Sequence, residues 1–107
     1  MRFAFDIFHM TALVYILYSP SFDTFYTGFT TISVSERLER HNSKYYDNAY
    51  TSRASDWEVY VLIECVSEQQ ARLIETHIKR MKSKQYIENL KKYPDMIGRL
   101  LTRYSIR

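Results

Sequence analysis

A run that is apolar at nearly every position, from Leu13 to Tyr18, sets the tightest limit on how this chain folds. A strand with one wet face alternates apolar and polar residues, whereas a strand buried on both faces is apolar throughout. We therefore expect this run to be the central strand of a sheet. Pro20 and Asp23 interrupt the pattern before a second, aromatic run from Phe25 to Phe29, so a β-hairpin is the simplest connection.

The register of that hairpin decides which side chains meet. With Leu17 opposite Tyr26, Tyr15 lies opposite Gly28 and the two tyrosines share one face of the sheet. We take this register as a working assumption.

A helix is predicted to begin after Ser33, because Ser33 and Glu36 have the spacing of a capping box. At about 100° per residue, Arg37 and His41 fall on the helix face that also carries the apolar stripe. The members of that stripe are Val34, Leu38 and Tyr45. Stripping water from an unpaired charge is costly, so we expect Arg37 to face an anion.

A third strand and a long loop complete the sheet. The stretch from Lys44 to Asp56 has no period and is rich in tyrosine, asparagine and serine, which indicates a loop. The strand that follows is predicted to place four apolar residues on one face: Trp57, Val59, Val61 and Ile63. These elements predict an α/β (α+β) domain with a small three-stranded, largely antiparallel sheet flanked by helices.

Three more helices are predicted after that strand. A second capping box, Ser67 to Gln70, opens a helix whose apolar stripe is Ala71, Ile74, Ile78 and Met81. Pro94 ends a short second helix, and Asp95 is the predicted cap of a third. The apolar stripe of this last helix either packs back over the sheet or docks a partner.

Length and charge narrow the function classes. A chain of 107 residues, 46% hydrophobic and 25% charged, is one globular domain rather than a disordered or membrane-embedded one. The net charge of +3 fits a polyanionic partner without requiring it. Much of the positive charge lies in the C-terminal third: Lys79, Arg80, Lys82, Lys84, Lys91, Lys92, Arg99, Arg103 and Arg107. These residues form either a solvated surface or, in part, a phosphate-binding rim.

Cys65 is alone, so we expect no intrachain disulfide and no cysteine metal cluster, and a reducing, cytoplasmic location. Residues 1–10 contain Asp6 and no long apolar core, which makes them a poor signal peptide and too short to span a membrane. We interpret residues 1–9 as an N-terminal extension and 10–107 as a single domain.

Taken in order, several short motifs resemble those of the GIY-YIG nuclease family, most closely its small single-domain bacterial members. The matching residues are Leu13-Val14-Tyr15, Tyr26-Thr27-Gly28, Arg37-Leu38 with His41-Asn42, Thr51-Ser52-Arg53 before Trp57, and Glu75 with Ile78-Lys79. Leu13 and Thr27 depart from the glycine and isoleucine of the family motifs, but both tyrosines and Gly28 remain. The resemblance implies the GIY-YIG fold and hydrolysis of DNA phosphodiester bonds.

The resemblance also implies roles for five side chains. Tyr26 would be the base for the attacking water, with Tyr15 positioning it or sharing the role, and Arg37 would clamp the phosphate. His41 would bind the phosphate or orient a tyrosine, although a histidine buried in the core for packing is the alternative. Glu75 would bind one Mg²⁺ or Mn²⁺ ion, which needs few protein ligands. A plain i,i+4 salt bridge to the lysine that follows is the other interpretation of Glu75.

Substrate contacts are predicted from Thr51, Ser52 and Arg53, which can all donate to a phosphate oxygen, and from Lys79. The loop residues could equally cap and solvate the loop. Two function classes follow: a metal-dependent DNA endonuclease, structure-selective and linked to repair or recombination, or a non-catalytic nucleic-acid- or protein-binding module with the same fold. The set of five convergent side chains favours the enzyme, because a binder needs none of them. A protein partner is left open.

Overall fold

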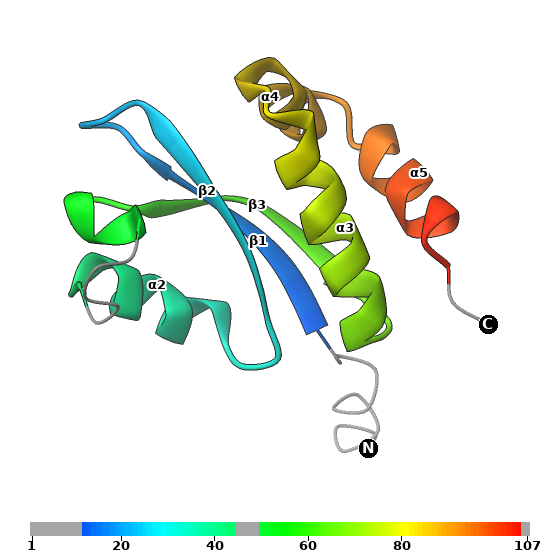
Figure 1. Ribbon diagram of the computed structural model, residues 1–107, viewed down its shortest axis with the longest axis horizontal. Coiled ribbons are helices and arrows are strands. Elements are labelled where there is room, and N and C mark those ends of the chain that lie inside the picture. The colour runs from blue at the N-terminus through cyan, green and yellow to red at the C-terminus, as the bar shows by residue number, and fades with distance from the viewer. Residues whose placement is uncertain (1–11, 45–49, 106–107) are drawn as a thin grey trace.

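The computed structural model describes residues 12–44 and 50–105 and shows an α+β fold (Figure 1). Its elements are β1 (Ala12–Ser19), β2 (Thr24–Thr30), α2 (Val34–Asn42), the 3-10 helix η1 (Tyr50–Arg53), β3 (Glu58–Cys65), α3 (Glu68–Met81), α4 (Lys84–Lys92) and α5 (Asp95–Arg103). The strand order β2-β1-β3 is antiparallel throughout, so β1 is central as predicted. Residues 1–9 and Tyr45, to which the sequence analysis assigned roles, lie outside the described residues.

The assumed hairpin register is confirmed, since Leu17 pairs with Tyr26 and Tyr15 with Gly28. A Cβ atom on Gly28 would lie only 2.8 Å from the Cζ and Oη atoms of Tyr15 and 3.1 Å from Cε2 of Tyr26. The Tyr15 ring therefore lies over the backbone of its cross-strand partner, in space that only a glycine leaves open.

Helices cover both faces of the sheet, which explains why β1 is apolar at nearly every position (Figure 1). On one face, α3, α4 and α5 complete the larger core with Ala71, Ile74, Ile78, Leu90 and Leu100 against Ala12, Val14 and Ile16. On the other face, α2 and η1 lie over a smaller core of Tyr15, Leu17, Ala54 and Trp57, with Val34 and Leu38 packed against it. The first two strands thus place Tyr15 and Tyr26 beneath α2.

The prediction that Trp57, Val59, Val61 and Ile63 share one face is wrong. Ile16 pairs with Val61 but Leu17 pairs with Val59, so β3 contains a bulge at Tyr60. The extra residue reverses the alternation. Val61 and Ile63 enter the larger core, whereas Trp57 is in the smaller core and Val59 is 38% exposed.

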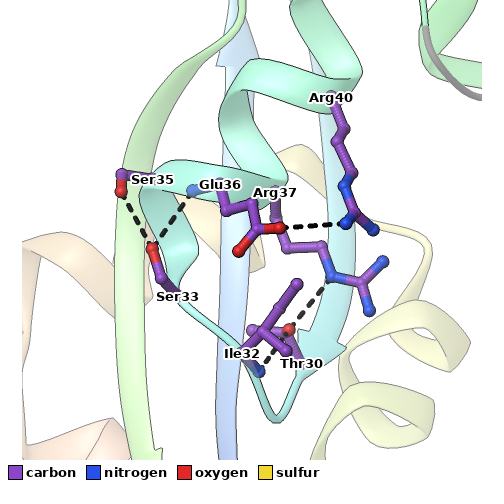
Figure 2. A network of polar contacts seen from close by, with 7 residues as sticks. All are labelled: Thr30, Ile32, Ser33, Ser35, Glu36, Arg37 and Arg40. Carbon is purple, nitrogen blue, oxygen red and sulfur yellow. Dashed lines mark hydrogen bonds and ion pairs between the residues drawn. The ribbon is translucent and has the colours of Figure 1, made fainter.

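The start of α2 is fixed by local hydrogen bonds (Figure 2). Ser33 caps the helix as predicted, accepting a hydrogen bond from the Glu36 amide at 3.2 Å. The Glu36 carboxylate pairs with Arg40 at 2.9 Å, one turn along the helix. The predicted long loop is wrong in part, because residues 50–53 form η1.

The C-terminal helices largely follow the prediction. Ser67 caps α3, and Gln70 is buried, donating to the Leu101 carbonyl oxygen at 3.1 Å, so that it ties α3 to α5. Met81 is 45% exposed rather than buried, because α3 ends there and the left-handed Lys82 redirects the chain. The predicted cap, Asp95, is instead the first residue of α5, preceded by Pro94, whose fixed φ suits a helix start. No helix within residues 12–44 and 50–105 is long and apolar enough to cross a membrane.

Candidate active site

A pocket of about 320 Å³ opens between the β1–β2 hairpin, α2 and α3. Its lining consists of Tyr15, Tyr26, Gly28, Phe29, Arg37, His41 and Glu75. The five side chains to which sequence analysis gave chemical roles therefore meet in one place. They come from four elements, and the fold brings them together because the hairpin register and α2 place the tyrosines beside His41, while α3 packs against β1 and β2.

A buried chain of hydrogen bonds runs from the pocket into the core behind it. Tyr15 Oη lies 3.0 Å from His41 Nε2, and His41 Nδ1 lies 2.7 Å from Thr51 Oγ1. All three side chains are at most 3% exposed. The backbone oxygen of Thr51 accepts a 2.9 Å hydrogen bond from Trp57 Nε1, so the end of the chain is anchored in the smaller core.

Burial and the nearby Arg37 guanidinium lower the pKa of His41 from 6.5 to about 4. The ring is therefore neutral at neutral pH, with a proton on one nitrogen only. One ring nitrogen then donates and the other accepts, so the hydroxyls of Tyr15 and Thr51 must act in opposite senses. The direction of the Thr51 hydroxyl consequently decides whether Tyr15 donates to His41 or accepts from it.

Thr51 is the residue whose interpretation the structure changes most. The sequence predicted that its hydroxyl donates to a phosphate, but the side chain is 1% exposed and bonded to His41. It does not line the pocket. We reinterpret Thr51 as a residue that holds His41, and no sequence pattern indicated this because the contact depends on how η1 packs against α2.

Tyr26 lies at the edge of an aromatic stack. Its ring centroid is 4.9 Å from that of His41 and 6.4 Å from that of Tyr50, with Tyr26 and Tyr50 nearly parallel. Arg53 lies over the Tyr50 ring at 4.5 Å, and Tyr50 Oη is held by Thr24 Oγ1 at 2.7 Å. The sequence did not identify Tyr50 as a site residue. The one feature that could have indicated it is its position directly before the motif Thr51-Ser52-Arg53.

Arg37 is held at the pocket by the end of β2. Its Nε donates to Thr30 Oγ1 at 3.0 Å, and the same threonine oxygen accepts from the Ile32 amide (Figure 2). The side chain is half-buried, so the predicted placement of a cation beside the apolar stripe of α2 is confirmed.

Glu75 lines the pocket and also forms the salt bridge that was its alternative interpretation. Its Oε2 lies 2.9 Å from Lys79 Nζ, and its side chain is 17% exposed. Lys79 Nζ is also 5.8 Å from the Tyr26 ring centroid. Glu75 is the one carboxylate of the pocket lining, and no cluster of three metal-binding side chains occurs within the described part of the chain. A single carboxylate oxygen fits a Mg²⁺ ion that keeps most of its water ligands.

Ser52 and Arg53, the other two predicted substrate contacts, lie on η1 beside this site. Ser52 is half-buried and Arg53 is exposed. Neither lines the pocket itself.

The chain was compared with known proteins. A family model described as the GIY-YIG catalytic domain matches residues 11–91, a span that includes every side chain of the pocket. Neither the curated proteins nor the solved structures gave a match.

Proposed function

Because the chain belongs to the GIY-YIG family, whose members are endonucleases, we propose that it is a metal-dependent endonuclease that hydrolyses DNA phosphodiester bonds. The observation that carries this proposal is the gathering of two phenols, a guanidinium, an imidazole and one carboxylate in a single pocket. Packing alone does not explain an arginine and a glutamate beside buried aromatic rings, because both would keep more of their hydration elsewhere.

In the proposed reaction, a water oxygen attacks phosphorus while one of its protons passes to Tyr26 Oη, which reacts as the phenolate. The bond from phosphorus to the leaving oxygen breaks, that oxygen takes up a proton from solvent water, and Tyr26 releases its proton to solvent before the next cycle. We assign the base to Tyr26 because its side chain is only half-buried, whereas Tyr15 is 3% exposed and hydrogen-bonded to His41. A tyrosine with an ordinary pKa near 10 is a weak base unless cations stabilise the phenolate, and here Arg37 and Lys79 are those cations.

Tyr15 and His41 position the base and the scissile phosphate in this proposal. Neutral His41 fixes the Tyr15 hydroxyl, and the Tyr15 and Tyr26 rings pack against each other at 6.3 Å. Arg37 clamps the non-bridging phosphate oxygens, for which its planar guanidinium is suited.

Glu75 is the residue we assign to a divalent cation. The salt bridge to Lys79 engages Oε2, so Oε1 is the oxygen we assign to the ion. When bound, Mg²⁺ or Mn²⁺ would neutralise charge on the phosphate and on the leaving oxygen. Lys79 then has two roles open to it, as the partner of Glu75 or as a contact to the substrate phosphate.

Arg53 and Ser52 extend the site along η1, and we propose that they contact phosphates that flank the scissile one. The Arg53 guanidinium lies over the Tyr50 ring, and the Tyr50 ring is stacked on the Tyr26 ring. These contacts hold Arg53 beside the pocket. Selectivity for branched or nicked DNA, and a role in repair or recombination, belong to the same proposal.

The alternative is a binding module that keeps the fold without cutting. One experiment separates the two: incubate the protein with branched, nicked and plain duplex DNA in Mg²⁺, in Mn²⁺ and in EDTA, alongside Glu75→Gln. Glu68→Gln is the matched control, because Glu68 sits two turns earlier on α3 and makes the same kind of i,i+4 salt bridge, with Arg72. We expect cutting that needs a divalent ion, that is lost in Glu75→Gln and that is unchanged in Glu68→Gln. DNA binding without metal-dependent cutting supports the binding module instead.

A further inference from the structure

The structure shows what surrounds the positive charges of the C-terminal third. Of the eight that it describes, five have a defined neighbour: Lys79 pairs with Glu75, Lys84 pairs with Asp23, Lys91 lies over Tyr60, Lys92 over Tyr93 and Arg103 over Tyr104. The arginines of this set are Arg80 on α3 and Arg99 and Arg103, one turn apart on α5. Within residues 12–44 and 50–105, no carboxylate forms a salt bridge with any of these three arginines.

Arg99 and Arg103 stand between two hollows. One, of about 260 Å³, lies between α3, α4 and α5 and is lined by His77, Tyr86, Met96, Arg99, Leu100 and Arg103. The other, of about 890 Å³, lies along the outer side of α5 and is lined by Pro94, Asp95, Gly98, Arg99, Thr102 and Arg103. The two arginines line both hollows, so a ligand in either one lies beside both side chains.

The surroundings of the inner hollow are electropositive. His77 Nδ1 is bonded to Tyr104 Oη at 2.8 Å, and burial, Arg103 and Arg80 lower the pKa of this histidine. Asp95 is the one acidic side chain that lines either hollow. The two arginines that line both hollows have one acidic side chain beside them, so their charges repel each other and a bound anion relieves that repulsion.

We propose that Arg99 and Arg103 form a second phosphate-binding site that holds the DNA strand outside the cleavage pocket. This inference rests on the proposed nuclease function and adds where the substrate continues. Arginine suits this task because its planar fork matches two phosphate oxygens at once.

The position of the site fits one nucleic acid that reaches both places. Glu75 lines the cleavage pocket and His77 lines the inner hollow. Residues two positions apart on an α-helix are rotated by about 200° around its axis, so these two side chains point to nearly opposite sides of α3. The cleavage pocket and the second site thus lie on opposite sides of α3. A helix is roughly 10 Å across, which corresponds to about three phosphates along one DNA strand. A substrate that crosses α3 would therefore contact both.

The test measures DNA binding in EDTA, so that it does not depend on cutting. Labelled 20-nucleotide and 2-nucleotide strands are titrated against the wild-type chain, Arg99→Gln/Arg103→Gln and a charge-matched control, Lys91→Gln/Lys92→Gln, across a salt series. We expect the arginine variant to bind the long strand more weakly. The slope of log K against log salt should become shallower by about 0.7 for each phosphate of the single strand that the variant no longer neutralises. We also expect it to bind the short strand like the wild type, because the short strand fills only the cleavage pocket.

Three outcomes would overturn a proposal. Equal weakening of binding in the arginine and lysine variants would show that only net charge matters, and would overturn the second site. Equal weakening on the short and long strands would overturn it too, since the site must lie beyond the pocket. If the wild-type chain neither binds nor cuts any DNA, the nuclease proposal itself fails, and the second site fails with it. Thermal unfolding of each variant shows whether the substitutions leave the fold intact.

Discussion

Gly28 connects the hairpin register to the chemistry of the pocket at the scale of single residues. The Tyr15 ring lies over this glycine, and its hydroxyl is held by His41 on the other side. The ring therefore has little room to yield to a larger neighbour. A residue that looks like a routine strand glycine sets the position of a buried phenol, and through its contact with Tyr26 it limits the second phenol too.

We predict that Gly28→Ala displaces both tyrosine rings. The added Cβ would be 2.8 Å from Tyr15, closer than stable contacts allow, so we expect a decrease of about 1–3 kcal/mol in the free energy of unfolding. Nuclease activity should fall more steeply than stability, because the ring positions are what the pocket depends on. Urea unfolding and a cleavage assay on the same preparation check this, and a fully active, equally stable variant would refute the packing argument.

Thr51 supports the second residue-scale prediction. Thr51→Val keeps the shape of the side chain but removes the hydroxyl, leaving His41 Nδ1 buried without this partner. We expect a destabilisation of about 1–3 kcal/mol, and a lower kcat with KM little changed.

Thr51→Ser is the matched control, because it restores a hydroxyl at the same position. It should recover most of the kcat, whereas a role in packing alone would leave serine no better than valine. Unchanged kcat in Thr51→Val would show that the hydrogen bond to His41 does not matter for the reaction.

At the scale of elements, α5 contains the other glycine of the chain in an unusual place. Gly98 lies inside the helix, where glycine costs more backbone entropy than alanine, and nothing lies within 4 Å of the Cβ atom it would carry. The internal packing of the described residues therefore gives no reason for glycine at this position.

We predict that Gly98→Ala stabilises the protein by about 0.5–1 kcal/mol, which corresponds to a rise in Tm of about 2–6 °C. Gly28→Ala should lower Tm, so the same chemical substitution is expected to have opposite effects at the two positions, and each variant serves as the control for the other. Differential scanning calorimetry of both variants checks the pair. A fall in Tm for Gly98→Ala would mean that α5 is not the regular helix described above.

Elements also show where the sequence pattern stopped being informative. The caps Ser33 and Ser67 could be predicted because each depends on residues three apart, whereas the predicted cap Asp95 lies inside α5. The bulge at Tyr60 could not, because it arises from pairing with β1 and leaves no mark on the local pattern of β3. The prediction assumed strict alternation along β3 and therefore placed Val59 in the core, whereas the structure places it at the surface.

For the whole molecule, the order of strands and helices could be predicted because hydrophobic periods and turn residues specify it. The members of the pocket came from the resemblance to a family, and the hairpin register that unites the tyrosines was assumed before it was seen. The roles of Thr51 and Tyr50 escaped prediction for a shared physical reason. Both contacts depend on how η1 lies against α2 and β2, and residues 50–53 carry no period from which that packing follows.

The last prediction concerns the stability of the whole chain in mild acid. The unfolded chain carries His41 at its ordinary pKa of 6.5, whereas the folded chain carries it at about 4. Between these values the unfolded state binds more protons, so stability falls as pH falls from about 6.5 to about 4. At about 1.4 kcal/mol per pKa unit, the decrease amounts to roughly 3 kcal/mol. His77 contributes in the same direction, since its pKa is lowered too.

Urea unfolding at pH 7 and pH 4.5 measures this decrease, and His41→Gln isolates the part that belongs to His41. The variant should be less stable than the wild type at pH 7, because its amide cannot reproduce both hydrogen bonds, but its stability should fall less on acidification. Titration of the histidine ring protons by NMR gives the pKa directly. A value near 6.5 for His41, or an equal pH dependence in the variant, would mean that the imidazole reaches water and that the buried chain from Tyr15 to Thr51 does not persist in solution.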